Sequence, residues 1–247
     1  MTDQTQSDAI LGGRVRLLQS ARGYRAGMDA ALLAAACDAR PGERVLDLGC
    51  GPGAVMLAAA VRRPGARFTG IEADPEALAL ARANIDLNAL ADRVEALAGD
   101  VALPFSRLGL PRFDAALCNP PFFDDAGALR GPAPEKTRAW MATGGLAAWT
   151  GYLLKAVRDG GTLTVIHRAD RLGDLLGLLA PKAGSIRIRP VQPRAAAPAS
   201  RVIVRAIRGG RAPLVLLPPL VLHPDGEGQH TPQAEAILRD ARPLDWG

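Results

Sequence analysis

VLDLGCGPG, at residues 45–53, places a short apolar run directly before three glycines that alternate with other residues. The run is typical of a buried strand, and the alanine-rich segment from Ala54 to Val61 is typical of a helix. A glycine turn between them lets a nucleotide-like ligand lie against bare backbone at the carboxyl edge of a parallel sheet. The spacing differs from the G-x-G-x-x-G dinucleotide fingerprint and lacks the Gly-Lys-Ser/Thr ending of a phosphate loop, which argues against ATP hydrolysis. The alternative is a turn that only needs flexible residues.

Strand and helix patterns alternate along the rest of the chain. We expect strands at 67–71, 94–98, 113–118, 162–167, 186–190 and 201–207, and further helices at 75–88, 145–158 and 171–179. Asp74 is expected to cap the helix that starts at Pro75, and an alanine-rich helix capped by Asp29 and ending near Gly42 would precede the first strand. A Pro/Ala loop joins the last two strands, which can therefore lie antiparallel.

This order predicts the α/β class, with a doubly wound sheet of about seven strands, helices on both faces and an antiparallel final strand pair. A single domain is expected over residues 1–247, with 1–9 as a loose tail. Residues 124–143 are rich in glycine, proline and charge, and a mobile loop or a short helix is expected there.

The composition suits a globular protein: 48% of the 247 residues are hydrophobic and the formal net charge is +5, which permits a polyanionic partner. The three cysteines and three histidines have no ligand spacing, so neither a metal site nor a disulfide framework is predicted. No secretory signal and no membrane-length apolar run is present, and a cytoplasmic location is expected. Trp140 and Trp149 are expected to be packing residues.

Acidic residues follow two other predicted strands. Glu72 comes about 20 residues after the glycine turn, where a carboxylate can accept hydrogen bonds from both ribose hydroxyls. Asp100 is placed to accept a hydrogen bond from an adenine amine, and the backbone amide of Val101 can donate to a ring nitrogen. The alternatives are a solvated carboxylate beside a helix for Glu72 and an ordinary turn residue for Asp100.

NPPF, at residues 119–122, ends the predicted strand 113–118. Its two prolines remove two backbone donors and fix φ, so the strand cannot continue. The side-chain oxygen of Asn119 and the carbonyl of Pro120 then form a pair of acceptors that suits the two hydrogens of an exocyclic –NH₂ group. Phe122 can stack on the base, which is typically worth ~1–3 kcal/mol. A plain Pro-Pro chain break is the alternative.

VLDLGCGPG resembles motif I of the class I S-adenosylmethionine-dependent methyltransferases, and NPPF downstream of it resembles the tetrad of the amino-group N-methyltransferases. The resemblance implies that glycines approach the methionine part of the cofactor while Asp47 acts on its amino group directly or through water. It implies S-adenosylmethionine binding by Asp47, Gly49, Gly51, Gly53, Glu72, Asp100 and Val101. It also implies that Asn119 and Pro120 orient the amine and that Phe122 stacks the base.

Within that set the chain most resembles the bacterial tRNA adenine-N6 methyltransferases that act beside the anticodon of valine tRNA. The resemblance covers nearly the whole chain, including GMDAALL at 27–33, EKTRA at 135–139, HPDG at 223–226 and TPQAE at 231–235. Phe122 and His230 stand where tyrosine is more usual, so the substrate is less firmly indicated than the reaction.

Three other functions remain open. The guanine-N2 rRNA enzymes usually have a histidine after the tetrad or a duplicated domain, whereas Phe123 follows here and no duplicate is present. The release-factor glutamine methyltransferases carry a helical domain before motif I, and only a short segment precedes it here. A non-catalytic RNA-binding module on the same fold is the alternative from a different class.

Two basic stretches make RNA the expected partner. One, from Arg14 to Arg25, has four arginines and no acidic residue; the other, from Lys182 to Arg211, has eight basic residues and no acidic one. Such strips can follow the phosphates of an RNA. The alternative is an ordinary solvated edge that charge protects against strand pairing.

Overall fold

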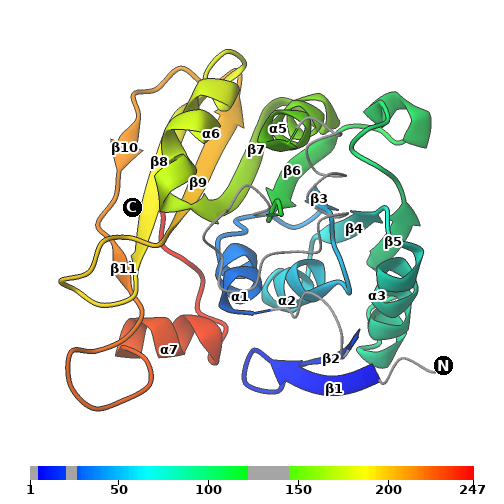
Figure 1. The fold of residues 1–247 in the computed structure, drawn as a ribbon. Helices are drawn as coiled ribbons and strands as arrows, with labels where there is room; N and C mark the ends of the chain where they lie inside the picture. The colour runs from blue at the N-terminus through cyan, green and yellow to red at the C-terminus, as the bar shows by residue number, and fades with distance from the viewer. Residues whose placement is uncertain (1–4, 21–26, 122–144) are drawn as a thin grey trace.

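The computed structural model describes residues 5–20, 27–121 and 145–247, and Figure 1 labels their helices and strands. The strands of the main sheet are β3 (Arg44–Leu48), β4 (Arg67–Glu72), β5 (Val94–Ala98), β6 (Phe113–Cys118), β7 (Val157–Arg168), β8 (Ala183–Gln192), β9 (Arg201–Arg208), β10 (Val215–Leu216) and β11 (Leu220–Val221). The helices are α1 (Met28–Ala35), α2 (Ala54–Arg62), α3 (Pro75–Leu87), α5 (Gly145–Ala156), α6 (Leu172–Leu179) and α7 (Pro232–Leu238), with single 3₁₀ turns at Phe105–Leu108 and Ala169–Arg171.

The sheet has the order β10-β8-β9-β7-β6-β3-β4-β5, with β11 also paired to β8. The strands from β5 to β7 are parallel, and β9 lies antiparallel between β7 and β8. The predicted doubly wound α/β fold and its antiparallel final pair are therefore confirmed. The two extra strands, β10 and β11, have only two residues each, because prolines interrupt the apolar run to which they belong.

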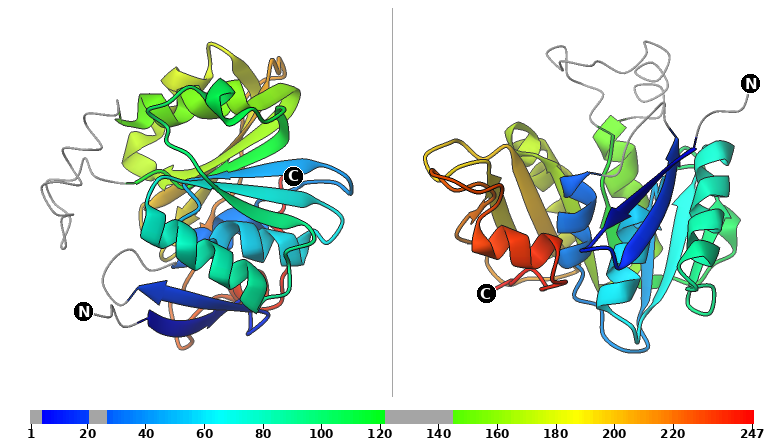
Figure 2. Two further views of the ribbon diagram at one scale, coloured as in Figure 1. Left: turned by 90° about the vertical axis from the view of Figure 1, so that its right-hand side faces the viewer. Right: turned by 90° about the horizontal axis from the view of Figure 1, so that it is seen from below.

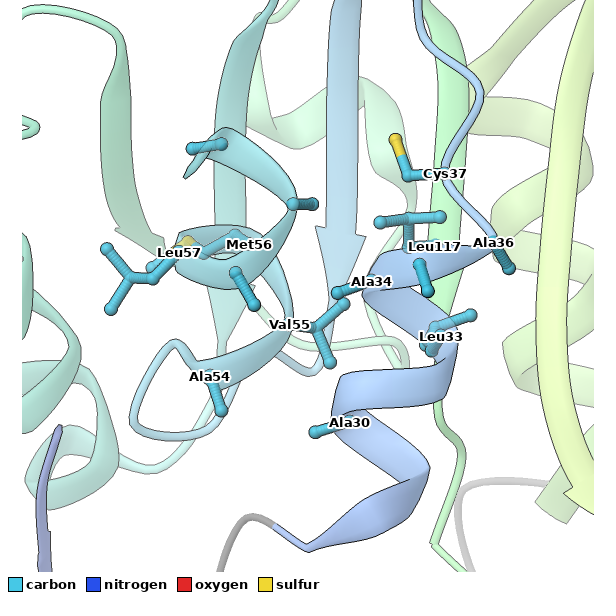
Figure 3. Packing of buried hydrophobic residues seen from close by; sticks show 14 of the residues in the cluster. Ala30, Leu33, Ala34, Ala36, Cys37, Ala54, Val55, Met56, Leu57 and Leu117 are labelled. Atoms are coloured by element: carbon cyan, nitrogen blue, oxygen red, sulfur yellow. The ribbon is translucent and has the colours of Figure 1, made fainter. Parts of the chain in front are cut away.

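Helices cover both faces of this sheet, as Figure 2 shows. One apolar cluster contains side chains of α1, α2, α3 and α7, and the other contains side chains of α5 and α6. Ala30 and Ala34 of α1 and Val55 of α2 lie between the two helices (Figure 3), and the small alanine side chains let the helices pack closely. This packing fixes the start of α2 and hence the glycine turn before it. No helix of the described ranges is both long and apolar enough to cross a membrane.

The first helix differs from the prediction at both ends. Its N-cap is Gly27, without a side-chain hydrogen bond, and Asp29 instead pairs with Arg201, with Oδ2 3.0 Å from Nε. The helix ends at Ala35 rather than near Gly42, and the C-terminal segment binds its last carbonyls. The backbone N–H of Leu244 donates to the oxygen of Ala35 at 2.8 Å, and the indole of Trp246 donates to Ala36. These partners lie too far along the chain for a local pattern to reveal them.

Residues 5–9, expected to belong to a loose tail, form most of strand β1 (Thr5–Ile10), which pairs antiparallel with β2 (Val15–Ser20). Asn84 of α3 and Asn88, the C-cap of the same helix, form hydrogen bonds with β2 as a neighbouring strand would. Asn84 accepts from the N–H of Leu18 at 2.7 Å and donates to its carbonyl at 2.9 Å, and Asn88 does the same to Arg16. The expected loop at 124–143 lies outside the described residues.

We predict that Asn84→Ala lowers the free energy of unfolding by about 2–4 kcal/mol, because it leaves buried backbone groups without hydrogen-bond partners. Asn84 is fully buried and also donates to the carbonyl of Pro52 at 2.9 Å, so it joins the hairpin to the glycine turn. Asn88→Ala is the matched control, and its half-buried site should make the loss smaller, about 1 kcal/mol. Urea unfolding of both variants measures the difference. Equal losses would contradict a special role for Asn84.

Candidate functional site

The predicted site residues follow neighbouring parallel strands at one edge of the sheet. Leu48, the last residue of β3, pairs with Ile71 of β4 on one side and with Cys118 of β6 on the other. Because adjacent strands lie about 4.8 Å apart, Gly49 and Asn119 begin the next segments side by side. The structure thus brings the glycine turn and the start of the NPPF tetrad to the same place.

The glycine turn has a backbone that favours glycine at each of its three positions. The φ angles are +72° at Gly49, +55° at Gly51 and +92° at Gly53, all in the left-handed region. The N–H groups of Gly49 and Cys50 both donate to the carbonyl of Ile71, at 2.8 and 3.0 Å. Gly53 is the N-cap of α2. The turn is therefore fixed to β4 on one side and leads directly into a helix on the other.

The described residues leave space for a ligand beside Gly51. A methyl group added to Gly51 would have no atom of residues 5–20, 27–121 or 145–247 within 4 Å, apart from its chain neighbours, whereas one added to Gly53 would lie 2.8 Å from the Cε atom of Met56. Bare backbone that faces open space, at the carboxyl ends of parallel strands, is what a nucleotide-like cofactor requires. The residues present therefore fit S-adenosylmethionine, the cofactor that the sequence resemblance implies.

Glu72 holds the glycine turn in shape. Its Oε2 accepts from the N–H of Gly51 at 2.8 Å, and its Oε1 accepts from the N–H groups of Ala73 and Asp74, both at 2.9 Å. A carboxylate offers about four lone-pair sites, so in this arrangement about one remains, on Oε2. Glu72 can accept one ribose hydroxyl without losing these bonds, whereas the sequence suggested two. Its ribose contact remains a prediction.

Asp47 lies beneath the turn rather than on its surface. Its side chain is buried, and Oδ2 accepts from the N–H of Met56 in α2 at 3.1 Å. Burial raises the pKa of Asp47 to about 7; the negative charge of Glu72 adds to the rise and the hydrogen bond from Met56 opposes it. From this position Asp47 can act on a cationic amino group through its charge or through water.

Asp100 and Val101 form the turn after β5. The Oδ1 atom of Asp100 accepts from the N–H of Ala102 at 2.8 Å, and Val101 packs against the apolar cluster beneath α5 and α6. Tyr152 of α5 is close enough that the charge of Asp100, after burial, raises its pKa. Tyr152 is buried and meets Phe105 edge-on at 5.8 Å. Tyr152 is not among the predicted site residues, although its place on the helix after the tetrad could have suggested it.

Trp149 of α5 is the second residue whose place the sequence did not reveal. It packs against the same apolar cluster, as expected for a packing residue. The atom Cη2 of its indole would lie only 2.5 Å from a methyl group at Gly49. The ring therefore lies directly on the first glycine of the turn.

The tetrad is described only in part. Asn119 is half-buried and Pro120 is buried where the chain leaves β6. Phe122 and Trp140 lie outside the described residues, so the stacking role of Phe122 stays a prediction. No group of three or more His, Cys, Asp or Glu side chains that could hold a metal occurs within 5–20, 27–121 and 145–247.

Most arginines of the second basic stretch hold the fold together. Three of them donate to backbone carbonyls: Arg187 to Trp246 and Gly247, Arg189 to Pro218 and Asp245, and Arg194 to Pro224. Three others pair with carboxylates: Arg201 with Asp29, Arg205 with Asp38, and Arg208 with Asp159. Lys182 and Arg211 are exposed. A contact with RNA phosphates therefore stays a prediction that rests mainly on these two cations.

The first basic stretch is described only up to Ser20. Arg14 donates to the carbonyls of Leu11 and Arg239, and Arg16 donates to the carbonyl of Leu87 at 2.8 Å. Arg22 and Arg25 lie outside the described residues. An RNA contact by this stretch also stays a prediction.

Comparison with known proteins shows which family and which fold the chain resembles. Residues 25–131 match the family described as methyltransferase small domain, and no curated protein matches the chain. A predicted O-methyltransferase, protein Atu636 from Agrobacterium tumefaciens, is 29% identical with a TM-score of 0.73; the match covers 88% of this chain and 98% of that one.

Two more distant solved structures share the fold. The precorrin-6y C5,15-methyltransferase from Geobacter metallireducens GS-15 is 14% identical with a TM-score of 0.54, over 78% of this chain and 94% of that one. TrmN from Thermus thermophilus is 23% identical with a TM-score of 0.52, over 73% of this chain and 48% of that one. The fold is thus the class I methyltransferase fold, whose cofactor is S-adenosylmethionine, and the matches support S-adenosylmethionine-dependent methyl transfer.

The raised pKa of Asp47 predicts a pH dependence. Protonation of Asp47 stabilises the folded protein. This contribution is fully present below the ordinary pKa of 3.8 and is lost as the pH rises through the raised pKa of about 7. A cationic amino group bound nearby favours the carboxylate, so affinity for S-adenosylhomocysteine should rise with pH up to about 7 and then level off. At pH 6, where the carboxyl group of Asp47 is mostly protonated, binding should therefore release protons.

Calorimetry at pH 6 in two buffers of different ionisation enthalpy measures this release. Asp47→Asn, which cannot ionise, should bind without the release. An equal release from the parent and from Asp47→Asn would show that another group titrates.

Proposed function

We propose that this protein is an N-methyltransferase that transfers a methyl group from S-adenosylmethionine to the exocyclic N6 of an adenine in tRNA. The observation that carries the proposal is the pairing of β3 with β6, which sets Asn119 beside the glycine turn. A methyl donor held on that turn and an amine held by Asn119 would face one another. A tRNA substrate also implies a cytoplasmic location.

The cofactor would be held by the backbone of the glycine turn, with Glu72 at its ribose, Asp100 and Val101 at its adenine, and Asp47 acting through its charge on the amino group. When bound, it supplies an electrophilic methyl group on a sulfonium. The chain contributes alignment and charge placement.

The acceptor would be held by the tetrad. Asn119 and Pro120 each offer one oxygen to the amine, and holding both hydrogens in bent positions favours a pyramidal nitrogen whose lone pair points at the methyl group. This matters because the lone pair of an aromatic amine is otherwise delocalised into the ring. The product ammonium loses its proton easily, so no strong base is required before transfer. Phe122 would stack on the adenine.

Methyl transfer to oxygen is the second candidate, because the Agrobacterium protein is described as a predicted O-methyltransferase. A hydroxyl group has one hydrogen, which leaves one of the two acceptors without a partner. An amine has two hydrogens and uses both acceptors, so the tetrad favours methyl transfer to nitrogen over transfer to oxygen. Among amines, the adenine beside the anticodon of valine tRNA is the first to test, followed by an rRNA guanine and a release-factor glutamine.

The test is incubation of the protein with S-adenosylmethionine carrying a labelled methyl group and with unmodified valine tRNA, followed by mass spectrometry of the nucleosides. The proposal expects labelled N6-methyladenosine. Label on a guanine, on a ribose oxygen or only on protein would show that the proposed acceptor is wrong and that the labelled group is the substrate. Tight tRNA binding without any label and without binding of S-adenosylmethionine would favour a non-catalytic RNA-binding module.

A further inference from the structure

The indole of Trp149 lies against the glycine turn at Gly49. If Gly49 carried a methyl group, that group would lie 2.5 Å from Cη2 and 2.6 Å from Cζ3 of the ring, closer than side chains can pack. The other side of the turn is fixed, because the N–H of Gly49 donates to the carbonyl of Ile71. Gly49 therefore lies between β4 and the indole with no room for a side chain.

We infer that Trp149 is a positioning residue for the cofactor: its ring holds Gly49 in place, so that Gly51 faces the ligand. This inference rests on the proposed function, since it assumes that a cofactor occupies the space beside Gly51. Trp149 acts through the turn and needs no contact with the reacting atoms.

Gly49 and Gly51 are then required for different reasons. Both have positive φ, +72° and +55°, so alanine carries a similar backbone strain at either position. The added methyl group would meet an aromatic ring at Gly49, whereas at Gly51 no atom of the described part of the chain lies within 4 Å of it. The chain's own packing thus requires glycine at 49, whereas the ligand requires it at 51.

The helix that carries the ring is held in place. Helix α5 is fixed to the sheet by Leu146, Tyr152 and Leu153, all of which are buried, and Tyr152 also packs on Phe105. A methyl group at Gly49 would therefore displace the turn or rotate the indole, while the helix stays in place.

A set of six proteins tests the inference: the parent, Gly49→Ala, Gly51→Ala, Trp149→Phe, and the two double variants that combine Trp149→Phe with each alanine. Phenylalanine keeps the apolar packing but is shorter than the indole. Affinity for S-adenosylhomocysteine is measured by calorimetry, and the thermal midpoint is recorded for each protein.

Gly49→Ala should weaken binding about tenfold or more and lower the thermal midpoint, since overpacking displaces the turn. Adding Trp149→Phe should restore the part of both losses that the contact with the indole causes, while the backbone strain of alanine at position 49 remains. Gly51→Ala should also weaken binding, because its methyl group enters the ligand space, but Trp149→Phe should not restore it. Absence of rescue at Gly49, or equal rescue at both glycines, would overturn the inference.

A second comparison covers the case in which Gly49→Ala does not fold. Recovery of folded protein by the added Trp149→Phe would then support the inference. If the double variant also fails to fold, Trp149→Ala and Leu153→Ala are compared instead, because each shortens one side chain of α5. Trp149→Ala should weaken cofactor binding about fivefold or more, while Leu153→Ala lowers the thermal midpoint and keeps the affinity. Equal losses of affinity would refute a positioning role.

Failure of the inference is distinguishable from failure of the proposed function. A parent protein that shows no binding of S-adenosylhomocysteine would refute the proposed function. A parent protein that binds, with no rescue of Gly49→Ala, would refute this inference alone.

Discussion

Asn119→Ala should lower the rate of methyl transfer by about 10²–10³-fold, because it removes one of the two acceptors that hold the amine for attack. Affinity for S-adenosylhomocysteine should stay within about twofold, since the cofactor contacts come from other strands. Single-turnover kinetics with tRNA and calorimetry with S-adenosylhomocysteine measure the two effects separately.

Asn119→Asp is the matched control for this variant. It keeps an oxygen acceptor at the end of β6 and should retain more activity than alanine. A parent-like rate for Asn119→Ala, with cofactor binding intact, would show that the tetrad does not orient the acceptor.

Glu72→Ala should weaken cofactor binding about 100-fold or more. The side chain fixes the N–H groups of Gly51, Ala73 and Asp74, and its loss releases the turn as well as the predicted ribose contact. At saturating cofactor the transfer rate should recover much of its parent value, because Glu72 does not act on the amine. Steady-state kinetics with varied S-adenosylmethionine therefore should show a raised KM and a smaller change in kcat.

Glu76→Ala is the control for Glu72, since Glu76 is an exposed carboxylate at the start of α3. It should leave both kinetic constants near the parent values. A Glu72→Ala protein with parent-like KM would contradict the assigned role of Glu72 in the cofactor site.

Local patterns predicted much of the fold. The bounds of β5 and β6 match the prediction, and Asp74 caps α3 by accepting from Glu76 at 2.8 Å. These features depend on residues close together in the sequence: an apolar run, a capping carboxylate, a proline in the first turn. The meeting of Asn119 with the glycine turn was also predictable, because the carboxyl ends of parallel strands share one edge.

The features that were missed depend on distant partners. Nothing near Ala35 shows that Leu244 will end α1, and nothing near Arg189 shows that Pro218 and Asp245 will bind its guanidinium. The contact of Trp149 with Gly49 likewise joins segments far apart in the chain. A basic stretch in a sequence therefore cannot distinguish arginines that meet a partner molecule from arginines that hold the protein's own backbone.

A crystal structure of the protein with S-adenosylhomocysteine tests most directly whether the glycine turn and Asn119 form one site. The ligand should lie against Gly51, with its ribose at Glu72 and its sulfur facing Asn119. A ligand bound elsewhere, or one whose sulfur faces away from Asn119, would contradict this arrangement.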